Sequence, residues 1–319
     1  MKSFKLWLFL AILAVAIAAP FFVYPIFLMK ILCFALFAAA FNLLLGYTGL
    51  LSFGHAAFFG GAGYCAGYLM RDMGVGPGGA IILGVLFAAA LGALIGGLAI
   101  RRQGIYFSMI TLALAQMFYF ICLQAPVSGG EDGFQGIPRG ELFGLVDLQN
   151  DLNLYYFVLV AVLVGFLFVT RIISSPFGQV LKAIKENEPR AISLGYKVNR
   201  FKFLVFVLSA ALAGLAGAVQ ALVLGFETLT DVHWTMSGLV ILMTLVGGVG
   251  TLAGPFVGAL VIVLLEHRVG EIGNFLAQIT SVAWFNSLGE SVTIVTGLIF
   301  VFCVMAFRRG LVGIFTKKQ

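Results

Sequence analysis

Apolar runs of about 20 residues recur along the whole chain, separated by short polar segments. A helix rises 1.5 Å per residue, so a run of ~20 apolar residues matches the ~30 Å hydrocarbon core of a bilayer. Read on a window of about 19 residues, the pattern predicts ten spans, at 6–28, 31–47, 54–70, 78–100, 104–124, 154–170, 203–224, 236–249, 253–270 and 284–306. The expected fold class is therefore an all-α integral membrane protein with about ten transmembrane helices.

The composition agrees with this pattern. Of 319 residues, 61% are hydrophobic and only 10% are charged, and the mean hydropathy is +1.09, whereas a soluble domain carries roughly 25% charged residues. A soluble core has no room for so much apolar surface, and the apolar runs continue from end to end. We expect a single transmembrane domain over residues 1–319.

Basic residues are distributed unevenly among the predicted loops. With the basic segment 171–202 placed inside, 15 of the 19 lysines and arginines fall on the inner side and four on the outer side, which is the asymmetry expected of a membrane protein. This topology predicts cytoplasmic termini, a periplasmic loop at 125–153 and a cytoplasmic loop at 171–202. The net charge of +6 thus reflects topology and does not indicate a nucleic-acid partner.

The first predicted span has an alternative interpretation. Two lysines precede an apolar run that reaches Ala-Ile-Ala at 16–18, which also resembles a signal-peptide cleavage site. The apolar character continues past Pro20 to Leu28, long enough to span a bilayer, so a retained helix is favoured.

Catalytic and cofactor motifs are missing from the sequence. There is no G-x-x-x-x-G-K-[ST] loop to hold nucleotide phosphates, so any ATP must be hydrolysed by another chain. The glycine-rich stretch 247–254 joins two predicted spans rather than a strand and a helix, so it is not a dinucleotide fingerprint. His55, His233 and His267 are too scattered for a nucleophile–base or metal constellation. We expect no catalytic residue, no metal site and no cofactor.

Polar residues in the stretch 42–60 interrupt an apolar region and are candidates for a translocation pathway. This stretch contains Asn42, Ser52 and His55 among four glycines, and Thr111 and Gln116 lie in a later span. Polar groups are costly in a bilayer unless they are satisfied, and broken helices in transporters expose backbone groups to a central cavity. The stretches 46–60 and 247–254 are therefore candidate re-entrant or broken helices. The alternative is that these side chains only tie neighbouring helices together.

Three sequence blocks occur in a characteristic order. The first is the stretch 42–60, the second is 102–117 with the following Gly129-Gly130-Glu131-Asp132-Gly133, and the third runs from Ser175-Pro176-Phe177-Gly178 to Phe201-Lys202. Together with matching segments at 233–234 and 247–255, these blocks resemble the permeases of branched-chain amino acid ABC importers, and the LivM-type subunit in particular. The resemblance covers nearly the whole chain.

This resemblance implies a cytoplasmic coupling helix within 171–202, between spans six and seven, that docks on an ATPase. The residues expected to make or support that contact are Glu186, Glu188, Arg190, Ala191 and Gly195. The implied partners are a second homologous permease subunit, two ATP-binding subunits, and a periplasmic or extracellular binding protein facing 125–153 and 225–235. The implied location is the cytoplasmic (inner) membrane of a bacterium or archaeon, in contact with lipid.

Two other functions stay open. Permeases of urea and short amides share the glycine block, so an amino-acid substrate is not separated from these by sequence. A stand-alone secondary transporter would need charged residues inside its spans, whereas Glu266 and Glu290 lie near span ends. An ATP-driven permease for leucine, isoleucine or valine is therefore the favoured interpretation.

Overall fold

The computed structural model describes residues 14–142, 144, 146–280 and 310–315, together with positions 297, 298, 301 and 305. The longer helices are α2 (Pro25–Thr48), α3 (His55–Arg71), α4 (Pro77–Ala99), α5 (Ile105–Gln124), α6 (Asp151–Ser174), α7 (Pro176–Glu186), α9 (Val198–Leu224), α11 (Trp234–Gly247) and α12 (Gly254–Thr280). The shorter helices are η1 (Ala19–Phe21), η2 (Pro126–Ser128), η3 (Gly130–Asp132), α8 (Glu188–Ser193), α10 (Leu229–Val232) and α14 (Gly310–Phe315). The strands are β1 (Phe134–Gln135), β2 (Glu141–Leu142), β3 (Val146–Asp147) and β4 (Phe226–Glu227).

Five of the described helices are long and apolar enough to cross a membrane: α2, α4, α5, α6 and α9. They coincide with the predicted spans at 31–47, 78–100, 104–124, 154–170 and 203–224. α3 has 17 residues and α11 has 14, so both are shorter, and α11 is an apolar helix. The total of ten spans stays a prediction, because most of the span 284–306, including Glu290, and residues 6–13 of the first span lie outside the described residues.

The start of α2 differs from the expected boundary. The hydropathy pattern predicted a break near residues 29–30, whereas the helix begins at Pro25 and carries Lys30 in its second turn. Proline suits the first turn of a helix because its missing N–H would be unpaired there anyway. The Lys30 amine lies 5.7 Å from the centroid of the Phe34 ring on the next turn, a cation–π contact that lets the helix retain the charge.

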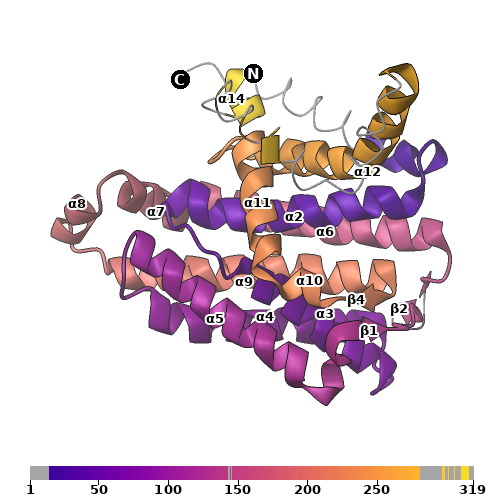
Figure 1. Cartoon of the computed structure of the whole chain (residues 1–319). Helices are drawn as coiled ribbons and strands as arrows, with labels where there is room; N and C mark the ends of the chain where they lie inside the picture. Colours follow the sequence, from indigo (N-terminus) through magenta and orange to yellow (C-terminus); the bar gives the residue numbers. More distant parts are fainter. Residues whose placement is uncertain are drawn as a thin grey trace.

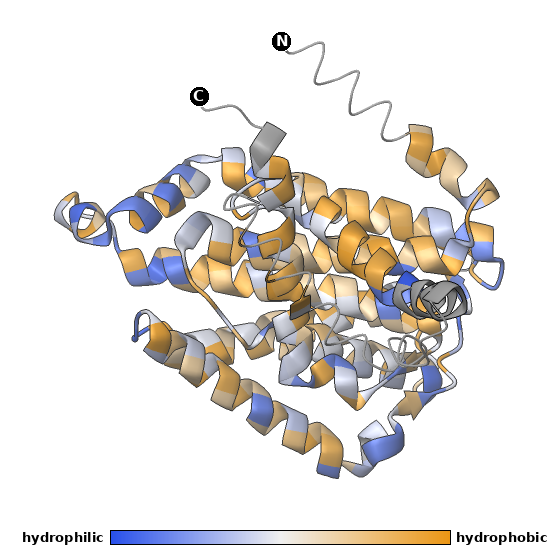
Figure 2. Ribbon diagram, turned by 45° about the horizontal axis from the view of Figure 1, so that its top comes forward, coloured by the Kyte–Doolittle hydropathy of each residue, from blue (hydrophilic) through white to orange (hydrophobic). Residues whose placement is uncertain are grey.

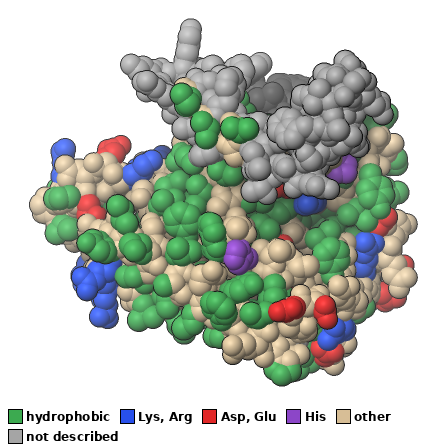
Figure 3. Space-filling view, viewed as in Figure 1, with side chains coloured by type: hydrophobic (Ala, Val, Ile, Leu, Met, Phe, Trp, Pro, Cys, Tyr) green, Lys and Arg blue, Asp and Glu red, His purple; other side chains and the backbone are tan. Residues whose placement is uncertain are grey.

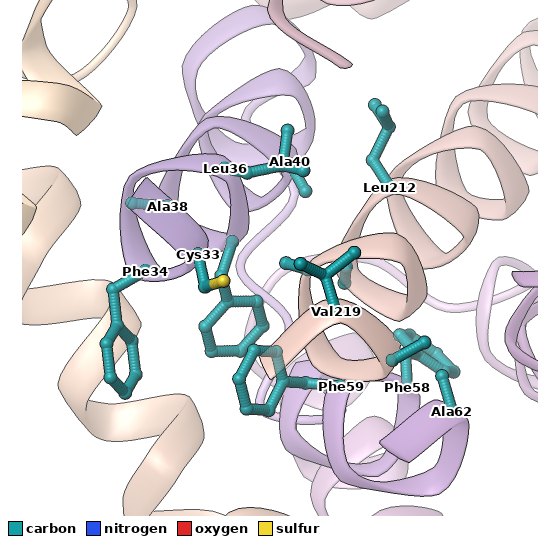
Figure 4. Packing of buried hydrophobic residues seen from close by; sticks show 14 of the residues in the cluster. Cys33, Phe34, Leu36, Ala38, Ala40, Phe58, Phe59, Ala62, Leu212 and Val219 are labelled. Atoms are coloured by element: carbon teal, nitrogen blue, oxygen red, sulfur yellow. The ribbon is translucent and has the colours of Figure 1, made fainter. Parts of the chain in front are cut away.

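Two helices form the centre of the bundle. The most apolar window of α2 is 83% buried and that of α9 is 67% buried, whereas the windows of α4 and α5 are 33% and 28% buried. Figure 1 shows α2 and α9 running alongside α3, α4 and α6, with α11 crossing their direction. In the core, Phe59 of α3 stacks on Phe34 and Phe37 of α2, with ring centroids 5.9 and 4.4 Å apart. Figure 4 shows this part of the core, to which α9 contributes Val219.

The peripheral helices present apolar side chains outward. Leu86, Leu94 and Leu98 on α4 and Leu167 on α6 are each more than half exposed. Figure 2 shows hydrophobic residues along the length of the helices and hydrophilic residues at the two ends of the bundle. Charged side chains gather at the same two ends in Figure 3. This is the distribution expected of helices whose outer faces contact acyl chains.

Close contact between α3 and α9 depends on Gly217. A Cβ atom at this position would lie 1.9 Å from the carbonyl oxygen of Phe59, far inside any real contact. Gly92 of α4 plays a similar part, since its Cβ would lie 2.5 Å from the Cβ of Ala210 on α9. Helices in membranes associate largely through such close backbone approach, because lipid supplies no hydrophobic drive between them.

The predicted outer loop 125–153 is tied to the end of α9. β1 pairs antiparallel with β4, placing Phe134 opposite Glu227. Arg139 forms an ion pair of 2.7 Å with Asp151 at the start of α6 and donates to the carbonyl oxygen of Val223 at 3.0 Å. The loop is thus a folded cover over one end of the bundle, as its turn-rich sequence suggested.

Candidate functional site

The connection between α2 and α3 is an irregular segment inside the protein. α2 ends at Thr48, Gly49 adopts a left-handed conformation with φ of +75°, and α3 begins only at His55. Leu50, Ser52 and Gly54 in between are buried. The chain is therefore interrupted within the stretch 46–60, and the exposed backbone groups of this break need partners inside the bundle.

Two side chains of α5 supply partners to this segment. The Ser108 hydroxyl donates to the carbonyl oxygen of Leu51 at 2.6 Å, and the backbone N–H of Phe53 donates to Thr111 Oγ1 at 3.2 Å. Thr111 in turn donates to the carbonyl oxygen of Ser108 at 2.9 Å. Thr111 was expected from sequence as a pathway residue, whereas Ser108 was not singled out.

The first turn of α3 is capped in a similar way. Ser52 Oγ accepts from the N–H of Gly54 at 3.1 Å, and Ser237 Oγ on α11 accepts from the N–H of Ala56 at 2.9 Å. Both serines are fully buried. A helix leaves its first N–H groups without internal partners, and these hydroxyls satisfy two of them.

His55 links three helices. Its Nε2 lies 2.8 Å from Ser209 Oγ on α9, and the Ser209 hydroxyl donates to the carbonyl oxygen of Ala40 on α2 at 2.6 Å. Because the single hydroxyl proton of Ser209 goes to Ala40, Nε2 carries the imidazole proton and donates to the serine. The ring lies edge-to-face with Phe41 and Phe58, and Nδ1 has no hydrogen-bond partner among the described residues.

Asn42 joins α2 to the break between α11 and α12. Its amide nitrogen donates to the carbonyl oxygen of Thr251 at 2.8 Å, and its amide oxygen accepts from the N–H of Gly250 at 2.8 Å. Since α11 ends at Gly247 and α12 begins at Gly254, the stretch 247–254 is a second interruption between helices. One asparagine thus satisfies two backbone groups of that interruption.

Gln116 lies apart from these contacts. It is half-buried on α5, and its side-chain oxygen has no hydrogen-bond partner in the described part of the chain. The other four expected pathway residues all bond to, or next to, one of the two interruptions. They are not brought together at one cavity: neither the 440 Å³ cavity at the ends of α4 and α9 nor the 320 Å³ groove between α2, α6 and α12 is lined by any of the five.

The predicted cytoplasmic loop 171–202 forms two short helices. α7 begins at Pro176, capped by the Ser175 hydroxyl, and buries Leu181 and Ile184. Asn187 ends α7 and caps α8, since its side-chain oxygen accepts from the N–H of Arg190 at 3.0 Å. The segment thus folds into amphipathic helices, as the spacing of its charged and apolar residues predicted.

Glu188 ties this segment to the bundle. Its carboxylate oxygens lie 2.7 and 2.8 Å from Lys202 Nζ on α9, and Gln103 in the α4–α5 turn donates to it at 3.0 Å. Lys202 is only 3% exposed. α7 is also fixed to α2, because Lys185 Nζ donates to the carbonyl oxygen of Gly46 at 2.7 Å.

The other expected coupling residues divide into two groups. Ala191 is buried against Ile184, so it supports α8 from within. Glu186, Arg190 and Gly195 are exposed. Gly195 has φ of +88°, and a Cβ there would meet nothing within 4 Å. Its conformation is thus one that other residues adopt only with strain.

Three exposed apolar side chains near α8 were not singled out from the sequence. Ile192, Leu194 and Tyr196 are 56%, 68% and 41% exposed at the end of the bundle that carries α7 and α8 (Figure 1). In the sequence they occupy every second position of a short charged segment, and this alternation is the signal by which they could have been found. Large apolar side chains exposed outside the membrane-spanning helices indicate a contact surface.

At the opposite end of the bundle, Glu227 is a buried acid. It is 2% exposed, and its carboxyl group presses against α3 at Gly63, where a Cβ would collide with it. Burial, and secondarily the nearby Asp231, raise the pKa of Glu227 well above its ordinary value. This burial could not be predicted from the sequence pattern, because Glu227 follows a predicted span and is expected there at the outer surface.

Comparison with known proteins identifies relatives over most of the chain. The family model described as "Branched-chain amino acid transport system / permease component" matches residues 23–307. The high-affinity branched-chain amino acid transport system permease protein LivM of Escherichia coli K12 is 28% identical over 257 residues, covering 73% of this chain and 60% of the relative. LivM of Salmonella typhimurium is 27% identical over 298 residues, covering 85% and 70%.

A further relative is named for the import of a different substrate. The autoinducer 2 import system permease protein LsrC of Klebsiella pneumoniae is 28% identical over 210 residues, covering 64% of this chain and 56% of the relative. This chain thus spans 56% to 70% of the length of these three curated relatives.

Proposed function

This chain belongs to the family of branched-chain amino acid transport system permease components, and on that premise we propose that it is the permease subunit of an ABC importer for leucine, isoleucine and valine. The observation that carries this proposal is the family match over residues 23–307, which includes both helix interruptions and the α7–α8 segment. The permease carries no ATP site of its own, and ATP is hydrolysed on two partner subunits. A second homologous permease completes the membrane part.

The α7–α8 segment is the surface that we assign to the ATPase. Ile192, Leu194 and Tyr196 supply an exposed apolar patch, and Arg190 and Gly195 lie on the exposed side of the same segment. Interfaces commonly combine an apolar centre with charged residues at the rim. Glu188 and Ala191 act from within, because their contacts hold α8 against α9. Movement of an ATPase against this patch would pass directly into α9 and α2.

The translocation pathway is proposed to involve the two helix interruptions. Asn42, Ser52, His55 and Thr111 bond at or beside backbone that is not part of a regular helix. Such hydrogen bonds can exchange partners at low cost when helices shift, whereas an intact helix cannot open locally without losing its own bonds. Gln116, with its unpartnered side-chain oxygen, remains the fifth candidate.

The sidedness of the protein follows from the basic residues. We place it in the cytoplasmic membrane of a bacterium or archaeon with both termini inside, so that α8 faces the cytoplasm. The folded cover 125–153 and the segment 225–235 then face the binding protein that delivers the substrate. The β1–β4 pairing joins these two outer segments.

Uptake by the assembled transporter tests this function. The chain is co-expressed with its partner subunits and reconstituted in liposomes. ATP is supplied on the side of the membrane that carries the ATPase subunits, and uptake of labelled leucine is measured. ATP-dependent leucine uptake that unlabelled isoleucine and valine compete is the expected result. Uptake of autoinducer 2 without uptake of leucine would favour the second candidate, for which the similarity to LsrC is the supporting observation.

Gly195 provides a test of the ATPase contact. Gly195→Ala and Gly195→Trp share the same conformational cost of about 1–2 kcal/mol at positive φ, but only tryptophan adds bulk to the exposed surface. We expect Gly195→Trp to abolish ATP-driven uptake and to release the ATPase in a pull-down, while Gly195→Ala keeps most of both. Normal uptake by Gly195→Trp would overturn the assignment of this surface.

A further inference from the structure

A cavity of 440 Å³ lies at the ends of α4 and α9, beside the α4–α5 turn. Its lining is divided by chemistry: one part is polar and the other is apolar. The lining residues are Gly96, Gly97, Ile100, Arg101, Asn199, Arg200, Phe203 and Leu204. The volume falls in the range of sites for small molecules, about 300–1,000 Å³.

The polar part of this cavity is strongly basic. Arg101 lies in the turn after α4 and Arg200 in the first turn of α9; both are exposed, and neither side chain has a hydrogen-bond or ion-pair partner in the described regions. No acidic residue lines the cavity. The cavity also adjoins the first turn of the 27-residue helix α9, whose N-cap, Lys197, makes no side-chain capping bond. A helix N-terminus of this kind favours a negatively charged group.

The apolar part continues along the membrane-facing side of the same helices. Gly97 is exposed, and a Cβ atom there would meet nothing within 4 Å, so the surface of α4 is recessed at this point. Leu204 on α9 is 51% exposed and forms the facing wall. A charged rim followed by a recessed apolar surface is the shape of an amphiphile with an anionic head.

We propose that this cavity binds an anionic phospholipid of the cytoplasmic leaflet. The phosphate lies between Arg101 and Arg200, and one acyl chain runs past Gly97 between α4 and α9. The inner placement follows from the distribution of basic residues along the chain. A bound lipid would contact the start of α9 only a few residues from Gly195, so it would stabilise the position from which the α7–α8 segment projects.

Native mass spectrometry of the purified transporter, in micelles supplemented with phosphatidylglycerol or phosphatidylcholine, tests this proposal. We expect retention of phosphatidylglycerol and little retention of phosphatidylcholine. Arg101→Ala and Arg200→Ala should each weaken phosphatidylglycerol binding about fivefold, and the double variant roughly 25-fold, as follows from ~1 kcal/mol for each basic residue near an anionic surface. Arg171→Ala, at the exposed inner end of α6, is the matched control and should change nothing.

Gly97→Leu tests the acyl-chain part without removing a charge. Leucine has open space at this position and a higher helix propensity than glycine, so the variant should fold normally and still lose the lipid. Equal retention of both lipids by the unaltered protein, or unchanged binding by the double arginine variant, would overturn the proposal. A crosslink from Gly97→Cys to the second permease subunit would also overturn it, by showing that protein fills the cavity.

Discussion

The ion pair between Glu188 and Lys202 makes a sharp prediction about how α8 is held. Lys202 is 3% exposed, and both carboxylate oxygens of Glu188 lie within 2.8 Å of its amine. Glu188→Gln keeps the shape of the side chain and removes its charge. The buried ammonium group is then left without a counter-charge, because Glu188 is its only ion-pair partner among the described residues.

The expected cost follows from the burial of the pair. Removing one partner of a buried ion pair costs about 3–5 kcal/mol, whereas replacing both partners by neutral groups is often nearly neutral. Since the Glu188 side chain is 21% exposed, we expect the lower end, about 3 kcal/mol. At 1.4 kcal/mol per tenfold, this raises the open population of the segment by roughly a hundredfold. The double variant Glu188→Gln/Lys202→Met should recover most of the loss.

Hydrogen exchange followed by mass spectrometry over residues 187–197 measures this opening directly. Amides of α8 should exchange up to roughly a hundredfold faster in Glu188→Gln than in the unaltered protein, because exchange reports local opening. The double variant should exchange nearly as slowly as the unaltered protein. If Glu188→Gln left exchange unchanged, Glu188 would not tether α8. If the double variant exchanged as fast as the single one, lost packing rather than the unpaired charge would be the cause.

Three further predictions concern the bundle itself. Gly217→Ala would place a methyl group against the carbonyl oxygen of Phe59, so we expect loss of monodisperse protein in size-exclusion chromatography. The control Gly238→Ala has open space around the added methyl group and should behave as the unaltered protein. A well-folded Gly217→Ala protein would contradict the α3–α9 contact. Asn42→Leu leaves two half-buried peptide groups of the α11–α12 connection without their partner. Full burial of an unpaired group costs about 1–3 kcal/mol, so we expect a smaller cost for each group and a lower thermal midpoint; an unchanged midpoint would show that the two hydrogen bonds contribute nothing. Burial raises the pKa of Glu227 in the folded state above its ordinary value of 4.5, so its stabilising contribution is present below that ordinary pKa and is lost as pH rises through the higher folded value. The thermal midpoint should therefore fall as pH rises above the ordinary carboxyl pKa, and Glu227→Gln should remove that component of the fall.

The helices could be predicted well where hydropathy alone determines them. α4 and α5 begin and end within about one residue of the predicted spans, because Pro77 and Gly104 mark their starts and the runs between are continuously apolar. α9 begins five residues earlier than expected. Lys202 lies in its first turns, and a window scale counts a buried lysine as a loop residue whether or not Glu188 neutralises it.

The site was harder to predict, because its contacts join residues far apart in sequence. Polar residues between 42 and 60 stood out as costly in an apolar region, but nothing in their spacing indicated that Asn42 would reach Gly250 or that His55 would reach Ser209. The small residue Ala191 was expected at a partner contact and lies inside the fold. A small residue permits close approach either by a partner protein or by another helix of the same chain. Only the packing of α8 on α9 shows that Ala191 is contacted from within the chain.

The unequal burial of the apolar helices determines what each can tolerate in sequence. α2 and α5 have similar composition, yet 83% of the apolar window of α2 is buried against other helices and only 28% of that of α5. In α5, exchange of one large apolar residue for another preserves the contact with lipid, which is fluid and adapts to shape. In α2 the same exchange changes a fixed volume, as with any tightly packed interior. A complete substitution scan should therefore find α2 selective for side-chain size and α5 selective mainly for the absence of charge.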